Sequence, residues 1–432
     1  MKPSPLRGNH AFSKFWAADG VSFAGTMVTT VVLPVLVYQR TGSAFETSLL
    51  VAIQTVPYLA CGLIAGAVAD RVDRRRLMYA CELISAVLVG SVPVANAFGA
   101  LTIAHVYLVA AGTATTFVWR DAADFGAIPA LVGRDVLASA YSRMASTASV
   151  MQIAGPAIGG VLAATIGPAP AMTIDAASYI ISGLLLASIR QPFTTADPAD
   201  HASARLRDRV GEGLRFLWRQ PMVRALSLLG FGNSVTLGVL FGLLVVDADQ
   251  QLGLPRTSSL IGVLYAAGAV GALVASAALP RLNRRFGVVI NSLAGRAVEA
   301  VLVVAFAVTT NAVAAMILFA GVNAASQLTI LVGIIYRQEV TPDHLQGRVN
   351  VVARMIAWGG QPFGAVLGGI VASVVSVRAA LALSSLGVAV TLLLGLVGPL
   401  RLTNAQARLD TTEEDVVPAG TDQGADHGSE HP

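Results

Sequence analysis

Long apolar runs, separated by short polar turns, make up most of the chain. One helical crossing of a bilayer needs about 20 apolar residues, and twelve runs come close to that length. We place them at residues 15–38, 47–69, 77–98, 101–121, 138–165, 169–189, 225–246, 258–280, 288–309, 312–336, 349–375 and 378–399. Residues 126–137 are neither clearly apolar nor clearly a loop. We expect an even number of spans, since an odd number would leave one charged tail outside.

Positive charges gather in the turns on one side of these spans. The stretch from Gly62 to Met78, GLIAGAVADRVDRRRLM, places four arginines between two apolar runs. Short cytoplasmic loops collect Lys and Arg, so this turn should face the cytoplasm. In that orientation 24 of the 29 Lys and Arg fall in inner loops, tails or helix ends. The exceptions are Arg40, Arg256 and Arg378 outside and Arg296 and Arg354 within spans. Both termini are therefore predicted to be cytoplasmic.

The arginine-rich turn occurs twice. From Ala272 to Gly287 the chain reads ALVASAALPRLNRRFG, a weaker copy of the turn at an offset of 210 residues. Residues 155–160, GPAIGG, return as GAVLGG at 364–369, at an offset of 209. Two remote stretches that share nearly one offset indicate an internal duplication. We predict two parallel halves of six spans each, related by an axis along the membrane normal.

These patterns divide the chain into four segments. We predict an N-terminal six-helix bundle (1–190), a cytoplasmic linker (191–221), a C-terminal six-helix bundle (222–402) and a disordered cytoplasmic tail (403–432). The linker sequence RLRDRVGEGLRFLWRQP has the spacing of a basic amphipathic helix, which suits the inner membrane surface. A plain solvated connector is the alternative. The predicted fold class is an all-α membrane protein with 12 transmembrane helices in two pseudo-symmetric bundles.

Composition agrees with a membrane protein and excludes several other classes. Hydrophobic residues make up 55% of the chain and charged residues 12%, whereas soluble domains carry about 25% charged residues. Cys61 and Cys81 lie in apolar runs and cannot form a disulfide framework. No phosphate-binding glycine loop with Lys-Ser or Lys-Thr occurs, and the histidines and cysteines lack metal-ligand spacing. We therefore expect no enzyme activity, cofactor, metal site or nucleic-acid partner, and no cleavable signal peptide.

The motifs resemble those of the major facilitator superfamily over roughly residues 12 to 400. GAVADRVDRRRLM is similar to the superfamily signature after the second span, although Asp73 stands where glycine is common. GPAIGG resembles its antiporter motif, which is found mainly in exporters. The stretches TGSAFETSLL, EGLRFLWRQPMVRAL and PDHLQGRVN are similar to the drug-efflux and enterobactin-exporter branch. The resemblance implies a monomer in the bacterial cell membrane that transports small molecules.

The resemblance also assigns roles to the two motifs. The first would form a cytoplasmic latch between the halves from Gly66, Asp70, Arg71, Arg74 and Arg75. In that latch Asp70 would meet the start of the eleventh span near residues 347–350, where a helix N-terminus favours an anion. The alternative is that the arginines only set the orientation. The second motif would form a sliding seam; its residues are Gly155, Pro156, Gly159 and Gly160. Static packing of small residues is the alternative.

Charged and polar residues within spans are candidates for coupling and substrate binding, because a charge in lipid is expensive. Asp19 and Glu82 are our candidates for proton handling, although a solvated or salt-bridged Asp19 is an alternative. Asp175 lies in the outer part of span six, and Arg296 with Glu299 is expected to be a structural pair. The candidate cavity-lining residues are Gln54, Gln152, Asn233, Asn323, Gln327, Arg354 and Gln361.

The fourth span differs from that of many proton-coupled exporters in the superfamily. It reads VYLVAAGTATTFV and has no charge before Arg120, so it lacks their arginine and glutamine motif. Coupling would have to use other carboxylates. We predict a secondary transporter that exports hydrophobic or amphipathic molecules by alternating access, in exchange for protons. The alternatives are a dedicated siderophore or metabolite exporter, an importer, and a membrane scaffold or sensor that transports nothing.

Overall fold

The computed structural model describes residues 6, 8–69, 71–133, 135–193 and 206–397. Helices form nearly all of this part of the chain, which contains no strand. The helices are α1 (His10–Thr41), α2 (Ala44–Ala69), α3 (Arg74–Ala97), α4 (Ile103–Val132), α5 (Leu137–Thr165), α6 (Pro168–Ala187), α7 (Leu206–Arg219), α8 (Pro221–Gln250), α9 (Leu260–Val308), α10 (Ala312–Val340), α11 (Asp343–Val374) and α12 (Val377–Val397). The prediction of an all-helical chain is confirmed.

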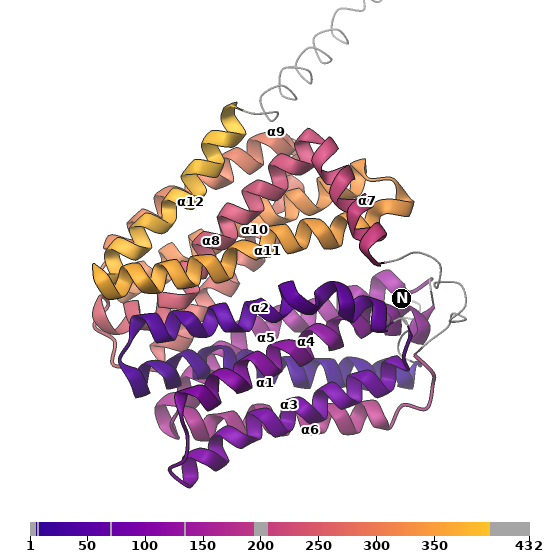
Figure 1. Ribbon diagram of the computed structural model, residues 1–432, viewed down its shortest axis with the longest axis horizontal. Coiled ribbons are helices and arrows are strands. Elements are labelled where there is room, and N and C mark those ends of the chain that lie inside the picture. The colour runs from indigo at the N-terminus through magenta and orange to yellow at the C-terminus, as the bar shows by residue number, and fades with distance from the viewer. Residues whose placement is uncertain (1–5, 7, 70, 134, 194–205, 398–432) are drawn as a thin grey trace, which may run out of the picture.

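The helices form two bundles, which lie one above the other in Figure 1. Helices α1 to α6 pack mainly among themselves, and helices α8 to α12 do the same. Helix α9 contributes two spans, so each bundle has six. The predicted fold class, two six-helix bundles, is therefore confirmed. We call the end with the turn at Gly42 the outer end and the end with Arg75 and α7 the inner end, following the predicted orientation.

The eighth and ninth spans are not separated by the loop that we predicted. The helix continues past Pro280 and its only residue with non-helical dihedral angles is Gly287, at φ 74° and ψ 172°. Arginine is a good helix former, so the basic residues of this turn extend the helix. The guanidinium of Arg284 also donates to the carbonyl of Pro280 at 3.3 Å. The chain then turns at Gly287, where a positive φ is easily adopted only by glycine.

Helix α4 is longer than predicted. We expected it to end at residue 121, but it continues to Val132 and ends at Gly133, with φ 77°. The predicted end follows the charged residues Arg120 and Asp121, and the extension contains a further acid, Asp124. Arg120 and Asp121 pair with side chains of other helices, so these charges do not end the helix. The uncertain stretch 126–137 is thus mostly helix.

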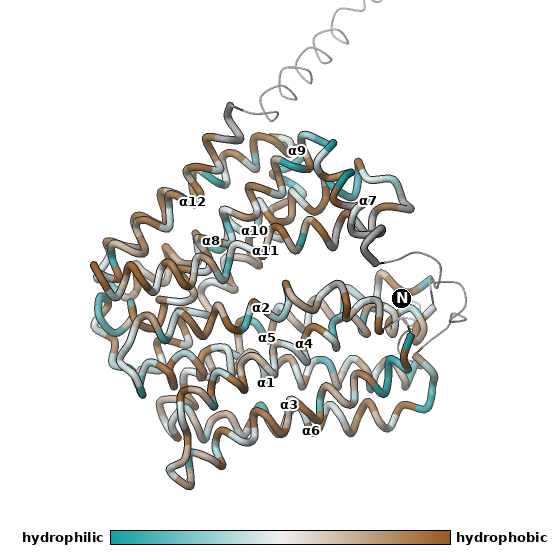
Figure 2. The backbone as a smooth tube through the Cα atoms, viewed as in Figure 1, coloured by the Kyte–Doolittle hydropathy of each residue, from teal (hydrophilic) through white to brown (hydrophobic). Residues whose placement is uncertain are grey.

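Apolar side chains cover the outside of both bundles. Nine helices within the described residues are long and apolar enough to cross a membrane, and Val377–Leu393 of α12 is a shorter apolar stretch. Hydrophilic residues gather near the helix ends in Figure 2. Phe98, Leu108, Val301 and Ile317 are among the large apolar side chains that are more than half exposed. Such a surface suits contact with lipid tails.

The glycine motifs of the two halves make equivalent contacts. A Cβ on Gly159 would lie 2.8 Å from the carbonyl oxygen of Val28, on the first helix of its own bundle. A Cβ on Gly368 would likewise lie 2.8 Å from Val239, on the first helix of the other bundle. The internal duplication seen in the sequence is therefore also present in the packing.

Each glycine motif ends in two adjacent glycines, and the second of them joins the two bundles at the outer end. A Cβ on Gly160 would lie 2.8 Å from the Cα of Gly262 on α9, and one on Gly369 would lie 2.9 Å from Ser48 on α2. On α8, Gly242 also packs against Ser48. Small residues permit such close approach. The outer end is therefore closed where glycines pack directly against small residues of the opposite bundle.

Helix α7 confirms that the linker contains a helix. Its Leu217 is buried against Val349, Val352 and Ala353 of α11, while Trp218 is about half exposed. The helix is thus attached to the C-terminal bundle through its apolar side. Residues 194–205 of the linker and the tail after residue 397 lie outside the described residues.

Candidate functional site

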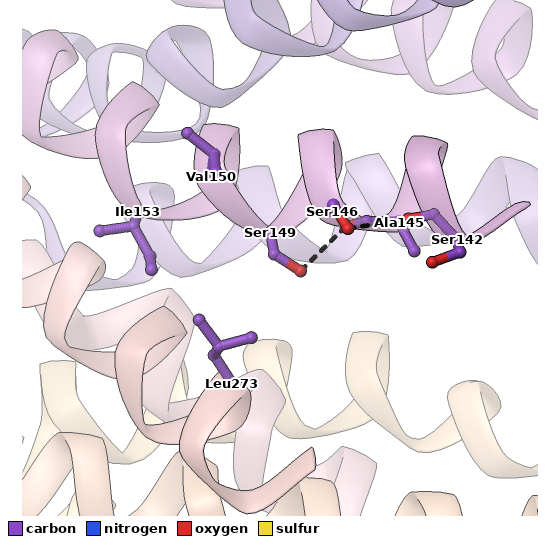
Figure 3. A pocket seen from close by; sticks show the side chains of 7 residues that line it. All are labelled: Ser142, Ala145, Ser146, Ser149, Val150, Ile153 and Leu273. Carbon is purple, nitrogen blue, oxygen red and sulfur yellow. Dashed lines mark hydrogen bonds between the residues drawn. The ribbon is translucent and has the colours of Figure 1, made fainter. Parts of the chain in front are cut away.

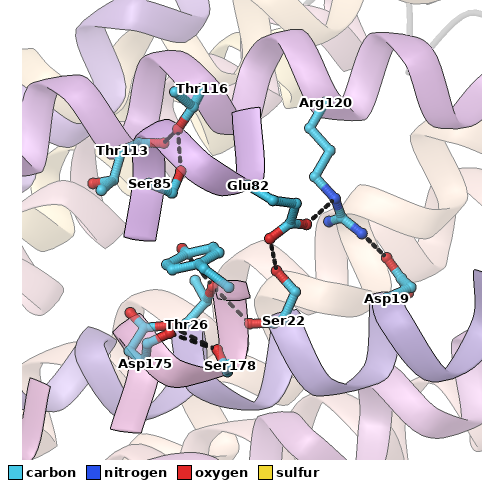
Figure 4. A network of polar contacts seen from close by, with 11 residues as sticks. Asp19, Ser22, Thr26, Glu82, Ser85, Thr113, Thr116, Arg120, Asp175 and Ser178 are labelled. Carbon is cyan, nitrogen blue, oxygen red and sulfur yellow. Dashed lines mark hydrogen bonds and ion pairs between the residues drawn. The ribbon is translucent and has the colours of Figure 1, made fainter. Parts of the chain in front are cut away.

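Arg120 is the centre of a charge network inside the N-terminal bundle (Figure 4). Its guanidinium, 11% exposed, lies 2.7 Å from Asp19 Oδ1 and 2.8 Å from Glu82 Oε1. The three residues come from α4, α1 and α3. Burying charges is tolerated only when they are paired. The sequence identified both acids as coupling candidates but gave no sign that they share one arginine.

Hydroxyl groups extend this network toward the outer end. Ser22 donates to Glu82 Oε2 at 3.2 Å, and the hydroxyls of Thr26 and Tyr179 lie 2.9 Å apart. A cavity of about 20 Å³ lies among these side chains and has room for about one water. Its lining residues are Ser22, Phe23, Thr26, Cys81, Glu82, Ser85, Thr113, Thr116, Phe117, Arg120 and Tyr179. The interior of the bundle is therefore polar along one side of α1.

Asp175 on α6 lies beyond these hydroxyls. Its side chain is almost fully buried. Thr29 donates to its Oδ2. The hydroxyl of Ser178 lies 3.3 Å from its Oδ1 and 2.8 Å from the backbone carbonyl oxygen of Asp175. The sequence showed this acid as a charge in a span, but did not show which groups surround it.

Arg354 connects the two bundles. Its Nη2 lies 3.7 Å from Asp121 Oδ2 on α4, and its guanidinium lies 5.1 Å from the ring centroid of Tyr58 on α2. Tyr58 also packs against Trp358, with ring centroids 5.3 Å apart. This predicted cavity residue is thus part of the contact between the bundles.

The remaining predicted cavity residues are spread over both bundles. Asn233 is buried and accepts hydrogen bonds from Arg296 and Ser326, each at 2.8 Å. Its amide oxygen is therefore occupied within the C-terminal bundle, next to the Arg296–Glu299 ion pair of 2.8 Å. Asn323 donates to the carbonyl of Phe319 on its own helix. The other glutamines are half-buried or exposed, namely Gln54, Gln152, Gln327 and Gln361.

The larger cavity lies between α5 and α9 (Figure 3), with a volume of about 390 Å³. Ser142, Ser146 and Ser149 form one side, and Ile153 and Leu273 lie toward the outer end. The hydroxyls of Ser146 and Ser149 donate to carbonyls of their own helix. The cavity wall is therefore apolar with few free polar groups. None of the predicted cavity residues lines it; the signal in the sequence was serine repeated at helical spacing.

The four predicted seam residues of the antiporter motif are buried on α5. Gly155 packs against Met27 and Gly159 against Val28, both on α1. Pro156 and Gly160 meet Gly262 of α9 in the opposite bundle. The motif thus lies at a contact between the bundles, where its role as a sliding seam stays a prediction.

The arginines of the other motif contact the N-terminal bundle. Arg75 donates to the carbonyl of Ala187 at 2.8 Å, at the end of α6, where a cation is favoured. The guanidinium of Arg74 lies beside Gly126 of α4. Arg71 is exposed, and a Cβ on Gly66 would meet no neighbour. Asp70, the residue expected to meet α11, lies outside the described residues, so the latch stays a prediction.

Arg256 connects the bundles at the outer end. Its Nε lies 3.0 Å from Asp249 Oδ2, and its guanidinium stacks 4.4 Å from the ring centroid of Tyr38 on α1. Tyr38 in turn donates to Asp249 at 2.9 Å. The hydrogen bond to Asp249 raises the pKa of the Arg256 guanidinium above its ordinary value. These three residues form what we call the outer clasp.

Within the described residues no three His, Cys, Asp or Glu side chains gather in a way that could hold a metal ion. The charged groups instead pair with one another.

Comparison with known proteins identifies the relatives of this chain. The sequence profile of the transmembrane secretion effectors matches residues 2–423. The multidrug efflux pump Tap of Mycolicibacterium fortuitum is 31% identical over 87% of this chain and 91% of its own. The enterobactin exporter EntS of Salmonella choleraesuis is 25% identical over 92% of this chain and 95% of its own. A solved mutant of the nucleoside transporter NupG has a TM-score of 0.74 at 10% identity, covering 89% of this chain and 98% of that one.

Proposed function

The chain belongs to the transmembrane secretion effectors of the major facilitator superfamily, which are transporters and not enzymes, and we propose that it exports hydrophobic or amphipathic drugs. The observation that carries this proposal is its 31% identity to the multidrug efflux pump Tap over 87% of the chain. The apolar cavity between α5 and α9 supports it, because such a wall accepts molecules of varied shape without demanding specific hydrogen bonds.

Export would proceed by alternating access. The bundles are in contact through glycines at the outer end, while the 390 Å³ cavity lies further inward between α5 and α9. On the proposal that both termini lie in the bacterial cytoplasm, this arrangement would be an inward-facing state that can load a substrate. Rocking of the bundles would then open the outer end. The chain would act as a monomer, with residues 1–190 and 222–402 as the two moving bodies.

Exchange for protons would supply the driving force. Asp19 and Glu82 are the proposed carriers, because they are linked to each other through Arg120 in the interior of one bundle. Carboxylates inside a membrane commonly mark ion or proton pathways. On this proposal, protonation of either acid weakens its pairing with Arg120 and alters the packing of α1 against α3 and α4.

Uptake into inside-out membrane vesicles tests the function. Vesicles that contain the protein should accumulate ethidium, a lipophilic cation, when their interior is acidic, and a protonophore should abolish the accumulation. Vesicles without the protein are the control. If no member of a broad drug panel accumulates, the proposal of drug export is wrong.

A dedicated siderophore exporter is the second candidate, because of the similarity to the enterobactin exporter EntS. In the same vesicles a catecholate siderophore would then accumulate while ethidium would not. Accumulation of ethidium that the siderophore does not inhibit contradicts this alternative.

A further inference from the structure

Asp175 is a buried acid that the proposed network of Asp19, Glu82 and Arg120 does not use. Its side chain is 1% exposed and its hydrogen-bond partners are the hydroxyls of Thr29 and Ser178. Among the described residues it forms no ion pair, unlike Glu82 with Arg120 or Glu299 with Arg296. An ionised carboxylate without a cation is strongly disfavoured in an apolar interior. The site therefore suits a carboxyl group that carries a proton for part of a cycle.

Helix α1 connects this acid to the charge network. Asp19, Ser22, Thr26 and Thr29 follow one another along one side of α1, over a rise of about 15 Å. Ser22 contacts Glu82 at the inner end of this row, and Thr29 contacts Asp175 at its outer end. Figure 4 shows Asp19, Ser22, Thr26 and Asp175 in this order.

Between the two ends the path is polar but narrow. The middle of the path is formed by Thr26 and Tyr179, whose hydroxyls are 2.9 Å apart, and by the 20 Å³ cavity that both residues line. Tyr179 lies one helical turn after Asp175 on α6. A row of hydroxyls with space for about one water can pass a proton and excludes larger ions.

The contact between α1 and α6 encloses Asp175. A Cβ on Gly25 would lie 2.5 Å from Asp175 Oδ1 and 2.8 Å from the Cβ of Ser178. Glycine at this position therefore lets the two helices approach closely over the acid. The enclosure explains why a small ion such as a proton, and not a drug, would reach it.

Few titratable groups act on this carboxyl. They are Glu82 from α3 and, on α6 itself, the phenol of Tyr179, while α1 contributes the hydroxyl of Thr29. Helix α5 also contacts α6, but its Arg143 lies at the inner end, 3.8 Å from the ring centroid of Trp16. Glu82 is itself paired with Arg120, so among the described residues the titratable groups that act on Asp175 include no cation.

The C-terminal bundle shows that packing does not require an acid here. At the repeat offset of 209 residues Asp175 corresponds to Ser384 on α12. There Thr236 of α8 donates to the carbonyl of Ser384 at 2.7 Å. The equivalent pair of helices is thus joined by hydroxyl and backbone groups alone. A carboxyl group at this place in only one bundle indicates a function beyond packing.

We propose that Asp175 is the outer proton site of the exchange cycle, a role that rests on the proposed proton-coupled export. Its carboxylate takes up one proton when the outer end is open and becomes a neutral carboxylic acid. The proton then passes along the hydroxyls of α1 to Glu82, which shares Arg120 with Asp19, and leaves to the cytoplasm. One proton enters and one leaves, so Asp175 returns to its starting state.

Reconstitution of the full chain in liposomes tests this role. Asp175→Asn should lower ethidium transport driven by a pH gradient by about a hundredfold, the low end of what a positioned proton-transfer group contributes. It should leave ethidium–ethidium exchange without a gradient at the rate of the original protein. Asp247→Asn is the matched control, because Asp247 is an equally buried acid in the other bundle, and both assays should be unchanged.

Other results contradict the proposal. Gradient-driven transport that survives Asp175→Asn removes Asp175 from the proton path. If Asp175→Asn elutes as a folded monomer and loses exchange as well, the residue acts in packing or substrate binding. If the variant does not fold, Thr29→Val provides the test: it should change the pH at half-maximal transport, and an unchanged pH profile is evidence against the role. A wild-type chain that transports no drug in either assay instead refutes the proposed function.

Discussion

Arg354 of α11 and Asp121 of α4 form an ion pair between the two bundles, with Nη2 3.7 Å from Oδ2. The side chains are 39% and 31% exposed, so water weakens their attraction. Arg354 also lies over the ring of Tyr58, which packs against Trp358. It must stretch or break if α11 moves relative to α4 during transport.

Breaking this pair should have a small effect on stability and a measurable one on transport. We expect a coupling energy of about 0.5 kcal/mol between Arg354→Ala and Asp121→Ala in a double-mutant cycle, as for exposed pairs. Thermal unfolding in detergent measures it. Each single variant should change the ethidium transport rate in the same direction, and the double variant should be no slower than the slower single one. Additive losses in the double variant would show that the two residues act separately.

Loss of the outer clasp should favour opening of the outer end. Arg256→Ala removes an ion pair with Asp249 and a stacking contact with Tyr38, together worth about 1 kcal/mol. Spin labels at Ala100 and Val375, exposed on opposite bundles, should show a larger fraction of molecules in which the two labels are far apart. Arg40→Ala is the control, because Arg40 bonds Asn96 within one bundle. Equal distance distributions in both variants would mean that the clasp does not hold the outer end closed.

A side chain at Gly160 should prevent closure of the outer end. Gly160→Ala places a Cβ 2.8 Å from the Cα of Gly262, and overpacking of this kind is unfavourable by about 1–3 kcal/mol. Because the contact joins the bundles, the outer-closed state should lose population while each bundle stays folded. Accessibility of a cysteine at Ser48 to a thiol reagent measures this change. Gly62→Ala, where a Cβ meets no neighbour, should leave this accessibility unaltered. A Gly160→Ala variant whose cysteine is no more accessible than in the original protein would refute the argument.

The buried pair of the C-terminal bundle should be important for stability and unimportant for pH dependence. Arg296 and Glu299 are fully buried, and Asn233 holds the arginine in place. Glu299→Gln leaves an unpaired buried cation, so we expect a loss of about 3–5 kcal/mol and a lower unfolding temperature in detergent. Arg296→Met combined with Glu299→Met should recover most of the lost stability. A double variant as unstable as Glu299→Gln would show that the charges themselves are required.

The sequence was sufficient to predict the fold because lipid imposes a simple rule on it. Apolar runs of spanning length gave the helices, and the repeated glycine motif gave the two bundles. The same rule failed where charges have distant partners. Helix α4 continues beyond Asp121, whose partner Arg354 lies in the other bundle. The loop expected before Gly287 is helical because arginines fit a helix as well as a turn.

The site was predicted in part. Asp19 and Glu82 stood out as charges in spans, but their shared partner Arg120 could be assigned only once three helices were placed. Asn233 was predicted to line a cavity, and its amide oxygen accepts a hydrogen bond from Arg296. A polar side chain in a span does not reveal whether it faces a cavity or another side chain. That distinction depends on the rotation of each helix, which the apolar pattern leaves open.

Where α5 crosses α9, Gly160 meets Gly262 backbone to backbone. A barrier made in this way is chemically featureless: it has no ring for a drug to stack on and no charge for it to compete with. Cargo cannot unlock it by recognition, and a mutation that alters cargo preference has no side chain to act on there. Any selection among compounds must therefore depend on side chains elsewhere, such as those that line the cavity between α5 and α9.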